Sequence, residues 1–328
     1  GVVAPASRGD TWLRVDATED ARVGDWLRLL IRSSRSVGAQ LHGGERPGED
    51  SFTKHYFVDT VFRVASVTPD SIELDRPLRV AVQPEWAPVL RTYEPKVENV
   101  GIEGITFEFP GTPKPRHFLE QGFNAIQILG AANSWVRDVT VIDGDLGIKA
   151  VRARFCQVER VRFIERNRTG ETGHHGLWAS GDVQDCLFSE FEFATTYVHD
   201  ISVEGFAHGN VFRKGRGVAV NFDHHRNGPY ENLFTDIHVG SGHRMWSSGG
   251  RGDRGPHSGA RTTAWNIQHD GEAQKVPSEA EFPQMNVIGV RGYGERSDSS
   301  GSWIQPLGDG DPPDLYDAQR ARRIKKGR

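Results

Sequence analysis

Cysteine, long apolar runs and a strong excess of one charge are all lacking in this sequence of 328 residues. Cys156 and Cys186 could pair with each other, but two cysteines do not make a disulfide scaffold, and we expect both to be small core residues. No apolar run is long enough to predict a transmembrane segment. The net charge of −4 argues against nucleic acid as the main partner.

The N-terminal sequence has no recognisable signal peptide. The chain opens on GVVAPASRGD rather than on methionine, which suggests that an upstream segment has been removed. We therefore expect a secreted or periplasmic protein.

Glycine is abundant and, like proline, is scattered along the chain, which predicts many short elements joined by turns. Residues 1–96 are predicted to form an N-terminal β region, because they contain the β-type runs TWLRV, DWLRLLI, YFVDTVFRVASV and SIELDRPLRV. The polar, glycine-rich stretch SVGAQLHGGERPGEDSF within this region is predicted to be an exposed loop.

A repeat begins near residue 97. Its units share a six-residue β-like segment followed by a turn and a second β-like run: NAIQIL (124–129), LGIKAV (146–151), HGLWAS (175–180), HDISVE (199–204), VAVNFD (218–223) and, as a sixth copy, HRMWSS (243–248). An earlier copy is VENVGIEGITFEF at 97–109. The copies start roughly 20 to 30 residues apart, which is the spacing of stacked supersecondary units.

Alternation within these segments predicts which side chains form a core. One set of positions is apolar in every copy, as in Ile126, Ile148, Leu177 and Ile201. A single unit is too short to bury this face, whereas stacked units bury a continuous column. The apolar period of two excludes a helical interpretation and sends the intervening residues outward.

This organisation resembles the right-handed parallel β-helix of the pectate-lyase-like superfamily over roughly residues 97–295. The stretch DHHRNGPYENLFTDIHVG is also similar to segments of poorly characterised β-helix proteins from bacteria that degrade polysaccharides. The resemblance implies an all-β fold, a right-handed parallel β-helix at 97–310 flanked or capped by the N-terminal region, and a C-terminal tail at 311–328. Another all-β solenoid or a sandwich is the alternative fold.

The predicted outward face carries a cluster of titratable side chains. Parallel strands of adjacent coils lie about 4.8 Å apart, so residues of neighbouring rows can reach one ligand. The candidate catalytic residues are His175, His199, His224, His225, Arg226, Tyr230 and Arg244. The candidate substrate-binding residues are Lys149, His174, Trp178, Asp200, Glu204, Asn221, Asp223, His243 and Trp246. A chance stack of surface histidines is the alternative interpretation.

A metal requirement stays open at this point. His174, His175 and His199 could offer nitrogen ligands, but no standard zinc spacing is present. Ca²⁺ bound by carboxylates on the same face is an equal alternative.

The chemistry of this face favours an enzyme that acts on an acidic polysaccharide. A lyase needs a base beside the uronate carboxylate and cations to stabilise the charge that develops there, and histidines and arginines suit both tasks. The predicted bases are His199 or His175, with Tyr230 as a second candidate to protonate the leaving oxygen. A glycoside hydrolase would instead use Asp200, Glu204 and Asp223 as its carboxyl groups. A carbohydrate-binding spike or adhesin is the non-catalytic alternative.

Overall fold

The structure, a computed structural model, describes most of the chain. The described residues are 1–32, 34–42, 56–113, 117–167, 172–246, 249–251, 259–271, 277–279, 281–290, 303–305 and 311–325. The chain divides into two compact units, with Gly1–Pro95 in the first and the chain from Lys96 to Arg251 in the second together with the C-terminal part. Among the described helices, none is long and apolar enough to cross a membrane.

The N-terminal unit contains an antiparallel sheet in the strand order β1-β4-β3-β2-β5. Its strands match the predicted β-type runs: β1 (Trp12–Arg14), β2 (Trp26–Arg32), β3 (Tyr56–Val67), β4 (Ser71–Leu74) and β5 (Val89–Thr92). The prediction of a loop after β2 is wrong in part, because helix α1 (Arg35–His42) occupies the first half of that stretch. The rest of that stretch, residues 43–52, lies outside the described residues.

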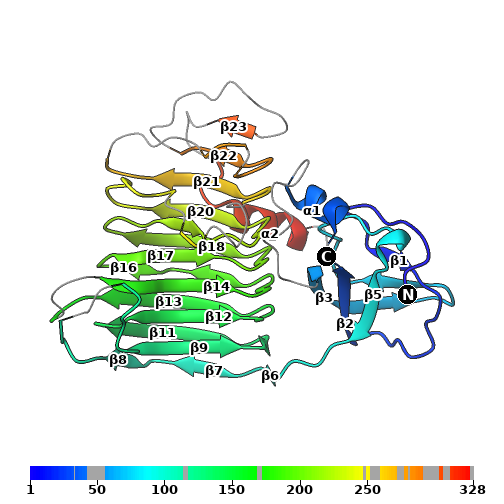
Figure 1. Ribbon diagram of the computed structural model, residues 1–328, viewed down its shortest axis with the longest axis horizontal. Coiled ribbons are helices and arrows are strands. Elements are labelled where there is room, and N and C mark those ends of the chain that lie inside the picture. The colour runs from blue at the N-terminus through cyan, green and yellow to red at the C-terminus, as the bar shows by residue number, and fades with distance from the viewer. Residues whose placement is uncertain are drawn as a thin grey trace. The chain divides into compact units, whose positions relative to one another are not determined.

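The second unit is the parallel β-helix that the repeat predicted (Figure 1). The longer sheet contains β7 (Gly101–Glu103), β8 (Thr106–Glu108), β11 (Trp135–Ile142), β13 (Gln157–Ile164), β15 (Leu187–Ser189), β16 (Glu192–Phe193), β18 (Val211–Gly217), β20 (Leu233–His238), β21 (Thr263–Gln268), β22 (Asn286–Ile288) and β23 (Trp303–Gln305). The shorter sheet contains β9 (Asn124–Leu129), β12 (Leu146–Val151), β14 (Gly173–Ser180), β17 (Tyr197–Val203) and β19 (Phe222–His224). β6 (Val97–Glu98) and β10 (Ala131–Ala132) form a third, two-stranded sheet.

The predicted register of the shorter sheet is correct for its first four strands. Ile148 pairs with Ile126 and Leu177, and Leu177 pairs with Ile201, so the predicted inward column is the observed one. In the fifth coil the predicted register is wrong by two residues, because Ile201 pairs with Phe222 rather than with Val220. A shift of two residues keeps every side chain on its face, whereas a shift of one would have inverted them.

The sixth predicted strand is not observed. The described part of HRMWSS, residues 243–246, forms turns, and β19 ends the shorter sheet. This segment still continues the coil, because the Phe222 amide donates to the Met245 carbonyl at 2.7 Å and Met245 is fully buried.

Aromatic rings of successive coils stack inside the β-helix. Phe212 lies between Phe188 and Phe234, with ring centroids 4.6 and 5.0 Å apart and planes nearly parallel. The coil spacing of about 4.8 Å matches the stacking distance of two rings, so one phenylalanine per coil fills the same column.

We expect the Phe212→Ala variant to lose about 3–5 kcal/mol of unfolding free energy, because no neighbouring ring can move along the ladder to fill the cavity. Urea unfolding followed by circular dichroism measures the loss. Phe118→Ala is the matched control, since Phe118 is 76% exposed and its removal leaves no cavity. Equal unfolding midpoints for the two variants would contradict this description of the core.

The two cysteines are free and buried in adjacent coils, as predicted for small core residues. The Cys156 amide donates to Cys186 Sγ at 3.4 Å, and the Cys186 amide donates to Asn210 Oδ1 at 3.0 Å. The Asn210 amide in turn donates to Asn232 Oδ1 at 3.1 Å. These side chains satisfy backbone donors at one corner of the β-helix, where the ladder itself cannot do so.

The C-terminal segment contains a helix, α2 (Leu315–Lys325), where the sequence suggested only a tail. It is tied to the longer sheet by buried Arg213, whose Nε donates to Asp314 Oδ2 at 2.7 Å. The Leu315 amide also donates to Thr235 Oγ1 at 3.1 Å.

Candidate functional site

The shorter sheet places one polar residue from each of four adjacent strands in a single outward column. β12, β14, β17 and β19 contribute Lys149, Trp178, Ser202 and Asp223 to this column. The two-residue shift in the fifth coil puts Asp223 beside Ser202, where the sequence alignment had placed Asn221. A carboxylate therefore lies next to the histidines of β14 and β17.

Asp223 is the centre of the site and is fully buried. Its Oδ2 accepts hydrogen bonds from His225 Nδ1 at 2.7 Å, His199 Nδ1 at 3.1 Å and Ser202 Oγ at 3.1 Å. Its Oδ1 accepts the Gly249 amide at 2.5 Å. Burial opposes ionisation, but the bonds from His199 and His225 outweigh it and lower the pKa of Asp223. The group is thus an anion that fixes its partners.

Asp223 sets the tautomer of three imidazoles. A carboxylate only accepts, so His199 and His225 carry their proton on Nδ1 and leave Nε2 as a base. Ser202 donates its hydroxyl proton to Asp223. The Ser202 oxygen therefore accepts a hydrogen bond from His175 Nδ1 at 3.0 Å. Burial, reinforced by the nearby His174 and His199, holds the pKa of His175 well below its usual value. His175 is therefore neutral at neutral pH.

Gly249 closes the site over these rings. A side chain there would place its Cβ 2.6 Å from Cε1 of both His199 and His225. Glycine is needed because the backbone amide must approach Asp223 to within hydrogen-bonding distance.

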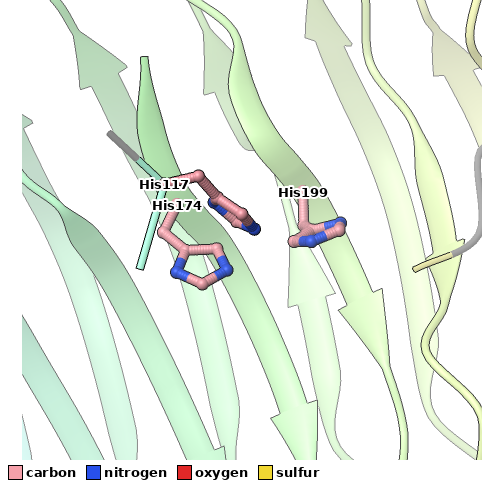
Figure 2. Close-up of side chains that lie close together, drawn as sticks. All are labelled: His117, His174 and His199. Atoms are coloured by element: carbon pink, nitrogen blue, oxygen red, sulfur yellow. The ribbon is translucent and has the colours of Figure 1, made fainter. Parts of the chain in front are cut away.

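His117 and Glu120 extend the cluster, and the sequence pattern predicted neither of them. The His117 ring lies 4.3 Å from His174 and 6.3 Å from His199, measured between centroids (Figure 2). Glu120 Oε1 lies 3.1 Å from His174 Nδ1 and 3.7 Å from His117 Nδ1. These two residues lie in the connection before β9, and an alignment of strands alone carries no signal for a loop residue.

Trp178 is outward, as predicted, but it is not an open platform for a sugar ring. His175 stacks on the indole at 4.0 Å between centroids, and Lys149 Nζ lies 3.6 Å from the ring centroid. A parallel ring and an ammonium group at these distances cannot share one face, so both faces of the indole are occupied. Partial burial lowers the pKa of Lys149, and the nearby charge of Glu204 opposes this shift.

A buried ion pair lies beside the cluster and is formed by Asp200 and Arg244, with Asn221 hydrogen-bonded to Asp200. Arg244 Nη2 donates to Asp200 Oδ2 at 2.5 Å and to the Tyr197 carbonyl at 2.6 Å. Asn221 donates its amide to Asp200 Oδ2 at 2.9 Å and accepts the Asp200 amide at 2.9 Å. Burial raises the pKa of Asp200 to about 6 even though Arg244 opposes the shift. Arg244 is thus engaged with the protein, which does not match the predicted role in binding substrate.

Two predicted site residues point into the core instead. His224 pairs with Val203 in the inward column and is fully buried, with its ring 4.5 Å from that of Phe282. Trp246 packs against the core, with its ring 5.6 Å from Phe222. The run Asp223–His224–His225 alternates faces, so its middle residue cannot share the site with its neighbours.

Two others lie outside the cluster. Tyr230 is buried and stacks on His208 at 4.8 Å, in a column of turn residues separate from the shorter sheet. His243 is exposed and its Nδ1 shares a hydrogen bond of 2.6 Å with Ser241. Tyr230 is therefore not placed to protonate a leaving group at Asp223.

The remaining predicted residues border the cluster. Arg226 donates from Nε to the Gly250 carbonyl at 3.1 Å, and a side chain on Gly250 would meet both Arg226 and His225. Glu204 is buried and accepts a hydrogen bond from Ser180 at 2.7 Å.

The arrangement can perform general base chemistry. His199 and His225, each held on one buried carboxylate, present Nε2 as a base of fixed orientation. His199 and His225 have side chains that are 10% and 14% exposed, so solvent and a ligand can reach them.

Comparison with solved structures shows the same fold in phage tailspikes. The tailspike protein gp49 of Pseudomonas phage LKA1 matches with a TM-score of 0.51 and 13% identity, over 88% of this chain and 46% of that one. The tailspike gp61 of Pseudomonas phage phi297 matches with a TM-score of 0.50 and 10% identity, over 94% and 50%. This chain thus spans about half the length of those tailspikes. No protein-family model matches the sequence, and no curated protein is similar to it. The likeness supports the parallel β-helix and leaves the pectate-lyase-like assignment a prediction.

Proposed function

We propose that this protein is a polysaccharide lyase that binds an acidic, uronate-containing polysaccharide over the shorter sheet and cleaves it by β-elimination. The observation that carries the proposal is the hydrogen bonding of His199 and His225 to one buried carboxylate, Asp223. Such pairing fixes an imidazole as a general base, which is the group that an elimination needs first. The tailspike neighbours support the same scaffold and no particular chemistry.

In the proposed reaction His199 or His225 takes the proton from the carbon next to the uronate carboxylate. The electron pair forms a carbon–carbon double bond as the glycosidic C–O bond breaks, and the leaving oxygen gains a proton from the site or from water. Lys149 and Arg226 are the candidate cations for the substrate carboxylate, because both border the cluster: Lys149 Nζ lies 3.6 Å from the Trp178 ring centroid, and Arg226 donates to the Gly250 carbonyl beside His225.

The carboxylates fit hydrolysis less well. A glycoside hydrolase needs one carboxylic acid and one carboxylate that flank the sugar. Asp223 is fully buried on its histidines and Asp200 is fully buried on Arg244, while Glu204 accepts a hydrogen bond from Ser180. Because both aspartates are engaged with basic side chains of the protein, the histidines are favoured as the reacting groups.

A non-catalytic carbohydrate-binding spike remains the second candidate. The tailspike fold is what favours it. The occupied faces of Trp178 count against a surface built on sugar stacking.

The test is a screen of the purified chain against acidic polysaccharides, with the ultraviolet absorbance of unsaturated uronate and the formation of reducing ends followed in parallel. We expect both signals to rise together on one substrate. Reducing ends without the absorbance would overturn the lyase in favour of a hydrolase. Saturable binding with neither signal would favour the spike.

A further inference from the structure

We propose that His117, His174 and His199 form a binding site for one divalent transition-metal ion, for which Zn²⁺ is the best-suited occupant. One ring nitrogen from each of the three residues lies within 4.8 Å of a ring nitrogen from the other two. Figure 2 shows the three imidazoles gathered over neighbouring strands. The inference concerns binding and does not depend on the proposed lyase activity.

The dimensions of the cluster suit a small ion. Zn–N bonds of 2.0–2.1 Å place the nitrogens of a tetrahedral site roughly 3.4 Å apart. Ring rotations therefore need to shorten the widest separation by an ångström or so. His117 lies in a turn rather than in a strand, so strand pairing does not fix its backbone, which can adjust together with the ring.

Carboxylates already orient the rings as in known metal sites. A metal-bound histidine usually gives its other N–H to a carboxylate, which fixes the ring and strengthens the ligand. Glu120 lies 3.1 Å from His174 Nδ1, and Asp223 lies 3.1 Å from His199 Nδ1. Nε2 of both rings is then the ligand atom.

The ligand chemistry selects the metal. Three imidazoles suit Zn²⁺, Co²⁺ or Ni²⁺, whereas Ca²⁺ requires six or more oxygen ligands. Three protein ligands leave a fourth tetrahedral position for water or a substrate oxygen. The side chain of His117 is 31% exposed, that of His174 is 18% exposed and that of His199 is 10% exposed, so an ion can enter from solvent.

A second group, His199, Asp223 and His225, also has ligand atoms close together. There the carboxylate oxygen and the nitrogens are 2.7 and 3.1 Å apart and already share hydrogen bonds. An ion would have to replace those protons, so the three-histidine group is favoured. With His199 bound to a metal, His225 is the imidazole left on Asp223 to act as a base.

The experiment is calorimetric titration of the chelator-treated full chain with ZnCl₂, with Co²⁺ as a visible probe of tetrahedral geometry. We expect one ion per chain, and His117→Ala and His174→Ala should each weaken Zn²⁺ binding by at least about 100-fold. His238→Ala is the matched control, because His238 is also paired with a carboxylate, Asp270, but lies on the longer sheet. Its affinity should equal that of the wild type. Circular dichroism verifies that each variant is folded.

The absence of Zn²⁺ binding by the wild type would overturn the proposal. So would loss of binding in His225→Ala with full binding in His117→Ala, because the ion would then belong to the second group. Metal binding without any polysaccharide cleavage would support the metal site and contradict only the proposed lyase activity.

Discussion

We expect Asp223→Asn to lower the kcat of the proposed polysaccharide cleavage by about 10²–10⁴-fold, which is the range that a positioned general base contributes. The amide can donate as well as accept, so it no longer selects the tautomer with Nδ1–H on His199 and His225. It also removes the charge that favours the imidazolium formed during proton transfer. The measurement is the initial rate of unsaturated product formation on the substrate found in the screen.

Asp270→Asn is the matched control for this variant. Asp270 also pairs with a histidine, His238, at 3.0 Å, but it is exposed and the pair lies on the longer sheet. We expect its kcat to equal that of the wild type. A folded Asp223→Asn variant that retains full kcat would exclude the Asp223-bound histidines as the base.

Arg244→Ala lowers the free energy of unfolding by about 3–5 kcal/mol, because it leaves Asp200 buried without its cation. The same guanidinium also donates to the carbonyls of Tyr197, Val198 and Ala219, which would lose this donor. Chemical denaturation measures the difference. We expect Asp200→Asn combined with Arg244→Ala to recover part of the loss, since the buried charge is then removed.

The destabilisation of Arg244→Ala depends on pH with a defined sign. Burial raises the folded-state pKa of Asp200 to about 6 from an ordinary value of 3.8, so its ionisation costs the folded state stability as the pH rises. Arg244 reduces that cost, and its removal raises the pKa of Asp200 further. The variant should therefore be closer to the wild type below pH 6 than above it.

Arg216→Ala provides the control for a surface ion pair. Arg216 pairs with Glu192 at 3.1 Å, but its side chain is 71% exposed, so we expect a change of about 0–1 kcal/mol with little dependence on pH. If Arg244→Ala lowers the free energy of unfolding no more than this control does, the ion pair with Asp200 does not stabilise the fold. The predicted role of Arg244 in binding substrate would then be favoured.

The repeat pattern predicts the architecture of the second unit. A period of two with apolar Ile126, Ile148, Leu177 and Ile201 at matched positions favours stacked strands, because a single unit is too short to bury its own apolar face. The register followed from the same positions wherever the six-residue segments align. The predicted register is wrong by two residues at Phe222, because alternation fixes the face of a side chain but not its position along the strand.

The stacking of coils also predicted that His174, His175, His199 and Asp223 lie near one another, and in the structure they do. It could not distinguish the members of a consecutive run. His224 lies between two site residues but faces the core, and Arg244 has the charge of a ligand-binding residue but neutralises Asp200.

Which of these groups act together depends on packing between coils and loops. His117 and Glu120 join the cluster from a loop whose path no periodicity encodes. Asp223 comes to hold His199 and His225 because adjacent coils bring β17 and β19 to hydrogen-bonding distance. Local pattern sets the face on which each side chain lies, whereas packing between coils and loops sets the distances of the few ångströms on which chemistry depends.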